Sequence, residues 1–214
     1  MFAGHYSAAF VAKAAEPRVP LWVLLLAAQF VDILWGVFVL TGIEQARLDA
    51  SLPSNPLDLV YMPYTHSLVG TLVWSAVAFA LARRRLGLGT SAAFAVAVTV
   101  TSHWVLDWVV HRPDLTLGLT GTKLGLAIWN HPIAAYLLEV ALVAASVWLC
   151  VRSCGIPGRE SRRWLGLAVV LVGLQTATSF GPLPTSLASM IGSALVVYLA
   201  VPWLGSRVDE ETTT

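Results

Sequence analysis

Long apolar segments alternate with short polar ones along most of the chain. An apolar segment of about 20 residues is long enough to cross a membrane as a helix. Six segments approach this length, at residues 21–42, 66–81, 91–110, 127–151, 164–180 and 187–203. The pattern therefore predicts an all-α fold, a polytopic transmembrane helical bundle with about six spans.

The first apolar stretch, residues 2–15, differs from these because it is too short to cross a membrane. It ends at Glu16-Pro17-Arg18, where the proline disfavours helix in the residue before it. We expect a short N-terminal helix within residues 1–18, either on the membrane surface or entering the membrane part-way. The segment has no basic region ahead of its apolar core, which argues against a removable signal peptide.

The chain shows no internal repeat and no linker long enough to separate domains, so we expect a single integral membrane domain over residues 1–214. Residues 19–151 form the spans that carry histidine and acidic residues, and residues 162–204 form a helix pair without either. Small residues let membrane helices pack closely, so we interpret this pair as a scaffold. Its glycines are Gly166, Gly173, Gly181 and Gly192. We expect residues 205–214 to form a solvated tail.

Basic residues are unevenly divided between the two ends of a six-span bundle. Ten lie on one side: Lys13, Arg18, Arg83, Arg84, Arg85, Arg152, Arg159, Arg162, Arg163 and Arg207. Three lie on the other: Arg47, Arg112 and Lys123. Positive residues favour the cytoplasmic side, so we expect a multi-pass protein of the cell inner (plasma) membrane with both termini in the cytoplasm.

Composition supports the membrane class and excludes others. Only 12% of the residues are charged, against about 25% in soluble domains, and we expect the lipid bilayer as the main partner. A net charge of +1 without a basic stripe gives no case for nucleic acid. The sequence leaves the oligomeric state open.

Ionisable residues interrupt two of the apolar segments. Residues 102–107 read S-H-W-V-L-D, which places His103 and Asp107 four positions apart and on one helix face. His66 opens another apolar segment within T-H-S at residues 65–67. Ionisable groups in hydrocarbon are costly and are usually paired, metal-bound or functional.

The depths of these residues agree with one another. A helical rise of about 1.5 Å per residue places five of them about 20–26 Å from the cytoplasmic boundary. They come from four separate spans and are Asp32, His66, His103, Asp107 and Glu139. His5 reaches the same region only if the N-terminal segment is a buried half-helix. We expect these side chains to form one cluster in the outer half of the membrane.

Imidazoles and carboxylates together are ligands of first-row transition metals, and zinc can lower the pKa of a coordinated water to about 7. The pattern predicts a divalent transition-metal site, with zinc as the leading candidate. The predicted ligands are His5, Asp32, His66, His103 and Asp107, with His111 and His131 as possible additional ones. The predicted catalytic carboxylates are those of Asp107, Glu139 and Asp114.

Structural interpretations stand beside the functional one. His103 and Asp107 could form a buried pair that holds helices together, and Asp32 could hydrogen-bond Gln29 or a neighbouring span. His66 could cap its helix together with Thr65 and Ser67, since all three are polar residues at a helix start. The chain has no H-E-x-x-H, G-x-S-x-G or phosphate-binding loop, which excludes the zincin, serine hydrolase and NTPase classes.

The T-H-S and S-H-x-x-L-D motifs resemble those of the YdjM-type family of predicted membrane-bound metal-dependent hydrolases. The residues that match the family pattern in order are His5, Asp32, His66, His103 and Asp107. The resemblance covers about residues 1–140. It implies a membrane-embedded metal site and a hydrolase activity.

The H-x-x-x-D spacing is also similar to that of zinc-dependent phospholipase C and P1-type nucleases, which are helical enzymes that bind several zinc ions and cleave phosphoesters. Those enzymes add an H-x-x-x-E, whereas His131 is followed four residues later by Ala135. The smaller ligand set favours one or two metal ions over three.

These observations lead to the hypothesis of a metal-dependent hydrolase that acts on a phosphoester or another small, lipid-like substrate. A metal-ion or proton-coupled transporter is the first alternative, since buried histidines and acids also form ion pathways. A non-catalytic membrane assembly subunit is the second. Broken spans in two matching halves would favour a transporter, and the first four spans show no such symmetry.

Overall fold

The structure, a computed structural model, describes residues 1–210, so the last four residues of the expected tail lie outside the described part. Its helices are η1 (Ala3–His5), α1 (Tyr6–Ala15), α2 (Leu21–Ala28), α3 (Phe30–Leu40), α4 (Pro63–His66), α5 (Leu68–Arg84), α6 (Thr90–Val110), η2 (Ile128–Asn130), α7 (Pro132–Ser153), α8 (Gly158–Phe180) and α9 (Leu187–Glu210). The predicted all-α fold is confirmed. An antiparallel hairpin of β1 (Gln45–Leu48) and β2 (Leu57–Tyr61) was not predicted.

Within residues 1–210, the four helices α6, α7, α8 and α9 are each long and apolar enough to cross a membrane. The pair α2 and α3 adds a fifth span if the two helices are counted as one, although they are bent by 47°. The second expected span is broken at Ser67, and α5 has only 17 residues. The chain is therefore a membrane protein with four or five such helices, fewer than the expected six.

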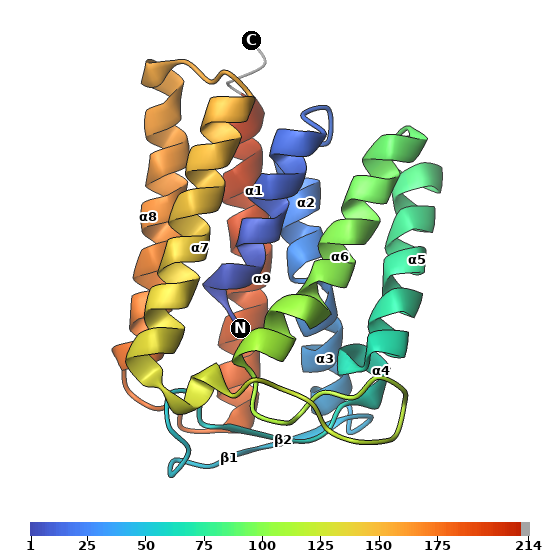
Figure 1. The fold of residues 1–214 in the computed structure, drawn as a ribbon, viewed down its shortest axis with the longest axis vertical. Helices are drawn as coiled ribbons and strands as arrows, with labels where there is room; N and C mark the ends of the chain where they lie inside the picture. The colour runs from blue at the N-terminus through green and yellow to red at the C-terminus, as the bar shows by residue number, and fades with distance from the viewer. Residues whose placement is uncertain (211–214) are drawn as a thin grey trace.

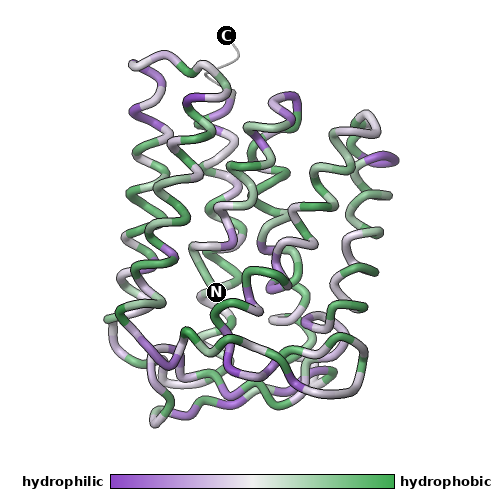
Figure 2. The backbone as a smooth tube through the Cα atoms, in the orientation of Figure 1, coloured by the Kyte–Doolittle hydropathy of each residue, from purple (hydrophilic) through white to green (hydrophobic). Residues whose placement is uncertain are grey.

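The bundle has two chemically distinct ends (Figure 1). The turns at residues 16–20, 85–89 and 154–157 lie together with the end of α9, and we call this the basic end. The hairpin, the segment between α6 and α7, and the α8–α9 linker lie at the opposite, hairpin end. Figure 2 shows mainly hydrophobic helices between ends that are richer in hydrophilic residues, as expected for a membrane-crossing bundle.

The N-terminal helix begins inside the bundle and runs to the basic end (Figure 1). Tyr6 and Phe10 are fully buried, and His5 is 1% exposed. The segment is thus a buried half-helix and not a surface helix. A Cβ atom at Gly4 would collide with the Met1 side chain and crowd Glu139, so the absence of a side chain at this position allows the close approach of α7.

Two breaks in the helices orient residues towards the bundle interior. Gln29 separates α2 from α3, and its side-chain amide donates a hydrogen bond to the Phe2 carbonyl. Asp32 then lies in the first turn of α3. Ser67 separates α4 from α5 and caps α5 by accepting a hydrogen bond from Gly70 N. Of the three residues that we considered for this capping, Thr65, His66 and Ser67, it is Ser67 that caps α5.

Three of the four glycines that we expected to let the C-terminal helix pair pack closely do not do so within the described residues. A Cβ atom at Gly166, Gly173 or Gly192 would meet no atom within 4 Å. The close contacts of α9 involve other glycines. A Cβ at Gly36 of α3 would lie 3.1 Å from Ile191, and one at Gly205 would collide with Leu25.

The expected tail is also helical over its described part, because α9 continues to Glu210. The carboxylate of Asp209 accepts hydrogen bonds from Lys13 Nζ at 2.9 Å and from Leu21 N at 2.8 Å. These contacts tie the end of α9 to the turn between α1 and α2. The expectation of a solvated segment was wrong here because an ion pair and a backbone donor hold the helix end.

Candidate metal centre

Five predicted ligands meet in the bundle interior. They are His5, Asp32, His66, His103 and Asp107, which come from η1, α3, α4 and α6. Each of these residues is at most 9% exposed. Two groups of three have ligand atoms within 4.8 Å of one another. The first is His5, His103 and Asp107, and the second is Asp32, His66 and His103. These buried clusters can hold a metal ion.

The imidazole Nε2 atoms face the two carboxylates. His103 Nε2 lies 3.1 Å from Asp107 Oδ2 and 3.5 Å from Asp32 Oδ1. His66 Nε2 lies 3.3 Å from Asp32 Oδ1 and 3.5 Å from Asp107 Oδ2. His5 Nε2 lies 3.1 Å from Asp107 Oδ1. Asp107 therefore occupies the centre of the cluster.

These separations fit a metal site. Tetrahedral zinc ligands with bonds of about 2.0–2.1 Å lie about 3.3 Å from one another. Three of the converging atoms are buried and make no hydrogen bond of good geometry, and their only partners are the ion-pair contacts of 3.1–3.5 Å within the cluster: His5 Nε2, His103 Nε2 and Asp107 Oδ2. Buried polar atoms nearly always have a partner, so a bound cation would account for all three.

The backbone sets the orientation of His103. Its Nδ1 lies 3.0 Å from the Ala28 carbonyl oxygen, which can only accept a hydrogen bond. Nδ1 therefore carries a proton, and Nε2 is the ring nitrogen that faces the carboxylates and could bind a metal ion. The His5 ring stacks on His103, with 3.7 Å between centroids and an interplanar angle of 7°.

His66 is oriented by a chain of two hydrogen bonds. Its Nδ1 lies 2.8 Å from Thr65 Oγ1, and the Thr65 hydroxyl donates to Glu44 Oε2 at 2.6 Å. Because the Thr65 hydroxyl donates its proton to Glu44, Thr65 Oγ1 can only accept a hydrogen bond from His66 Nδ1. His66 Nε2 is then the ring nitrogen that faces Asp32 and could bind a metal ion. Such outer contacts commonly orient metal-binding histidines.

Glu44 was not a predicted site residue, although it is only 1% exposed. Its Oε1 accepts hydrogen bonds from Tyr64 N at 2.8 Å and Thr65 N at 3.0 Å. The hairpin brings it to this position, and no spacing signal in the sequence connects it with residues 64–66.

The C-terminal helices also contribute polar groups that we did not predict. Tyr198 of α9 donates a hydrogen bond to Asp32 Oδ2 at 3.3 Å. Gln175 of α8 accepts one from Ala3 N at 3.2 Å. The expected scaffold pair thus helps to position both an acid and the N-terminal segment. An uncharged Tyr or Gln in an apolar segment gives no clear sequence signal.

The three predicted catalytic carboxylates have different surroundings. Asp107 lies at the centre of the cluster. Glu139 Oε2 accepts hydrogen bonds from Phe2 N at 2.8 Å and Gly4 N at 3.0 Å, so it holds the beginning of the half-helix. Asp114 Oδ2 lies 3.7 Å from His111 Nδ1, at the edge of the site.

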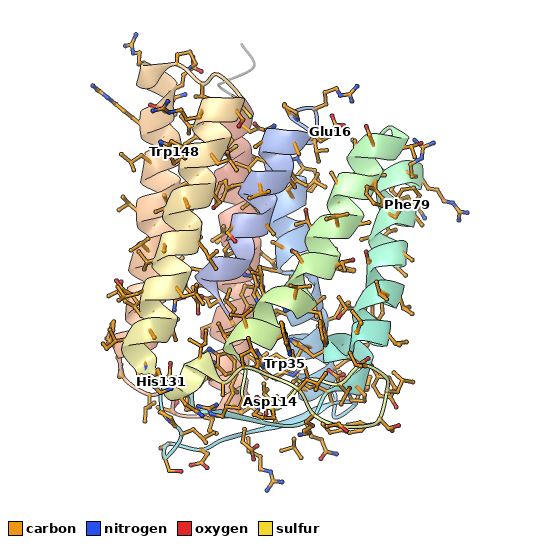
Figure 3. The ribbon with its side chains drawn as sticks, in the orientation of Figure 1. Glu16, Trp35, Phe79, Asp114, His131 and Trp148 are labelled. Carbon is orange, nitrogen blue, oxygen red and sulfur yellow. The ribbon has the colours of Figure 1, made fainter. Side chains whose placement is uncertain are left out.

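The two additional histidines differ from each other. His111 Nε2 lies 3.1 Å from Asp107 Oδ1, and its ring packs 3.9 Å from that of Trp129. The Met1 backbone nitrogen is also 2.7 Å from Asp107 Oδ1. His131, by contrast, is exposed at the beginning of α7, at the hairpin end (Figure 3), and belongs to neither ligand group.

Arg112 connects the hairpin to the segment that precedes α7. Its guanidinium donates hydrogen bonds to the carbonyl oxygens of Pro53 and Asn55 and, at 3.2 Å, to Asn130 Oδ1. It also lies 5.7 Å from the Trp129 ring centroid. Partial burial lowers the pKa of Arg112, an effect that the nearby Asp114 carboxylate opposes.

A cavity of about 390 Å³ begins at the cluster and extends between α3, α7, α8 and α9. Asp32, His66 and His111 line it near the cluster, and residues 54–57 and 181–184 line it at the hairpin end. Much of its wall is apolar, including Trp35, Leu57, Trp129, Leu174, Ile191 and Val197. The volume is typical of small-molecule sites, about 300–1,000 Å³.

The bundle is tightly packed between the cluster and the basic end. Five core side chains on α1, α2, α7 and α8 have no exposed surface: Tyr6, Phe10, Leu24, Val143 and Trp164. The site is therefore approached from the hairpin-end half of the bundle.

No protein-family model, curated protein or solved structure matches this chain. The resemblance to the YdjM-type hydrolases therefore remains an expectation that rests on the two sequence motifs.

Proposed function

We propose that this protein is a membrane-embedded, zinc-dependent hydrolase that acts on a phosphoester or lipid-like substrate. The observation that carries the proposal is the convergence of three imidazoles and two carboxylates at the spacing of metal ligands, beside a largely apolar cavity that Asp32 and His66 of this cluster line. The cavity gives a substrate access to the centre.

His66, His103 and Asp107 are the proposed core ligands, and Asp32 and His5 complete the set. When bound, the ion supplies Lewis-acid polarisation of a phosphoryl oxygen and a water that is nucleophilic at neutral pH. His103 Nε2 has one lone pair and can serve only one of the two ligand groups. The residues therefore support one fully ligated ion.

Hydrolysis needs a proton acceptor near the attacking water. The water oxygen bonds to phosphorus, the phosphorus–oxygen bond to the alcohol breaks, and the alcohol leaves with a proton. Glu139 lines the cavity, and its Oε2 accepts the backbone donors of the half-helix. We propose that the other carboxylate oxygen of Glu139, Oε1, accepts the proton of the attacking water.

The proposed orientation places the basic end in the cytoplasm of the cell and the hairpin end outside the inner membrane. The positive-inside rule supports this choice, because the turns at residues 16–20, 85–89 and 154–157 share one end. In this arrangement α5 and the bent pair α2 and α3 are counted as spans, which gives six in total. The substrate then approaches from the outer leaflet.

The packed core favours the enzyme over the transporter. Alternating access needs a route from each side of the membrane. Here the cavity lies in the hairpin-end half, whereas buried apolar side chains such as Phe10 and Trp164 fill the half towards the basic end. A hydrolase needs access from one side only.

Metal analysis and activity assays on purified protein test the proposal. We expect near-stoichiometric zinc and hydrolysis within a panel of phosphoesters, both of which are lost in His103→Ala. His131→Ala is the matched control, because this exposed histidine belongs to neither ligand group. Folded protein that binds no metal when zinc is added would contradict the proposal. Metal- or proton-coupled flux in vesicles, without hydrolysis, would identify a transporter.

A further inference from the structure

We propose that the cavity binds the hydrocarbon chain of a membrane lipid, which enters from the bilayer between α8 and α9. The phosphoester of the same lipid would lie at the metal centre. The assignment of the head group rests on the proposed hydrolase function, whereas the chain subsite rests on the cavity itself.

Much of the cavity wall that α8 and α9 form is apolar. Leu174 of α8 and Ile191, Ala194 and Val197 of α9 line this part of the cavity. Ile191 is only 2% exposed, so the wall reaches the bundle interior. An aliphatic chain can fill such a space without leaving polar groups unpaired.

The cavity opens through the side of the bundle that α8 and α9 form. Ala177 and Thr178 of α8 line the cavity and are also exposed, and the same is true of Ser193 of α9. Residues with both properties mark the opening. Because α8 and α9 are both apolar enough to cross a membrane, the proposal places this opening towards lipid.

The charges around the cavity argue for a lipid over a nucleotide or another polyphosphate. Of the described residues that line the cavity, none is Lys or Arg. Highly charged phosphates are usually held by such cations. The histidines and acids that line the cavity are Asp32, His66, His111 and Glu139, and Asp32 and His66 are themselves proposed metal ligands. A phosphoester of low charge with an apolar tail matches both the polar part of the cavity beside the metal ligands and its apolar part.

Photo-crosslinking with a phospholipid that has a diazirine near the end of one acyl chain tests the subsite. The protein is reconstituted in vesicles with this probe, irradiated, and mapped by mass spectrometry. Lipids around the bundle will label outward-facing residues in any case. Labelling of Leu174 and of the buried Ile191 requires a chain inside the cavity, and we expect both to be labelled.

Two tryptophan variants of the same helix provide the control. Ala194→Trp fills the cavity and should lose most labelling at Leu174 and Ile191. Val196→Trp adds the same side chain at a position that is 67% exposed and should retain the labelling. If Ala194→Trp does not fold, Ala177→Trp narrows the opening from α8 and should have the same effect. Equal labelling in the filled and control variants, or no labelling of Ile191 in the wild type, would overturn the inference.

The experiment also separates this inference from the proposed function. Labelling of Ile191 in metal-free His103→Ala protein is expected, because the chain subsite has no metal ligand. If labelling is found but zinc binding and hydrolysis fail in the wild type, the subsite stands and the hydrolase proposal fails. If the wild type binds zinc and hydrolyses a short-chain phosphoester without labelling at Ile191, the subsite is wrong and the hydrolase proposal stands.

Discussion

At the scale of single residues, metal binding depends on which imidazole nitrogen has the lone pair. His66 and His103 both direct Nε2 to the carboxylates because Nδ1 is engaged elsewhere, with Thr65 in one case and the Ala28 carbonyl in the other. The first of these contacts involves a side chain and can be tested by substitution.

Thr65→Val should lower metal affinity by about 10–100-fold, the usual effect of losing an outer contact to a metal-binding histidine. The valine has a similar shape but cannot accept the proton on His66 Nδ1. Thr65→Ser keeps the hydroxyl and should stay close to wild type. Competition with a zinc chelator measures both affinities. Equal affinities of the two variants would show that Thr65 does not orient His66.

Asp107→Asn should abolish stoichiometric metal binding, since this carboxylate contacts His5, His66 and His103. The amide is neutral and places an NH₂ group among the imidazoles. Asp114→Asn changes a carboxylate at the edge of the site and should retain the metal. Elemental analysis of the folded variants distinguishes them, and metal retention in Asp107→Asn would remove Asp107 from the ligand set.

At the scale of elements, the buried half-helix is held at its beginning by Glu139 of α7. Helix N-termini have backbone donors without partners in the helix, and Phe2 N and Gly4 N use the same Glu139 oxygen. Glu139 therefore has a structural role and a proposed chemical role, and two substitutions can separate these roles.

Glu139→Ala leaves the buried Gly4 N and the partly buried Phe2 N without a partner and should destabilise the protein by about 1–3 kcal/mol for the buried donor and by less for the other. Glu139→Gln keeps an acceptor oxygen, so it should be closer to wild type in stability and metal content but lose turnover. Thermal unfolding in detergent and the hydrolysis assay give the two results. Full activity of Glu139→Gln would exclude this residue as the proton acceptor.

The contact between α3 and α9 predicts a difference between two glycines. In a helix, replacing glycine by alanine stabilises by about 1 kcal/mol in the absence of contacts. Gly192→Ala should show this gain because its Cβ meets open space. Gly36→Ala should gain less or lose stability, since its Cβ lies 3.1 Å from Ile191. Unfolding temperatures of the two variants, measured in parallel, test the packing of α9.

At the scale of the whole molecule, the position of the cavity gives the two ends different roles. The basic end closes the bundle with packed side chains, and the hairpin end gives access to the centre. This division has meaning in a cell only if the hairpin end lies outside, so membrane orientation is the first property to establish.

Cysteine labelling in whole cells tests this orientation. In a background with Cys150 and Cys154 replaced by serine, a membrane-impermeant reagent should label Thr120→Cys in intact cells. Arg159→Cys at the basic end should react only after permeabilisation. The reverse result would place the metal centre and cavity near the cytoplasm and contradict the proposed substrate side.

The sequence by itself determined the class of the protein and part of its site. Long apolar segments require a membrane or an equally apolar environment, and this follows from composition without any tertiary contact. The placement of His103 and Asp107 on one face follows from the helical repeat alone. Depth along each span grouped Asp32 and His66 with them, and the structure brings Asp32, His66 and His103 within the range of one metal ion.

The tertiary structure decided everything that depends on how the helices pack and bend. It placed His5 in the cluster by burying the half-helix, and it left His131 exposed at a helix end. It brought Glu44 to Thr65 through a hairpin and Tyr198 to Asp32 across 166 positions. Such contacts join segments whose separation in the chain carries no local period. The cavity has the same origin, because it exists only between four helices whose packing no single segment specifies.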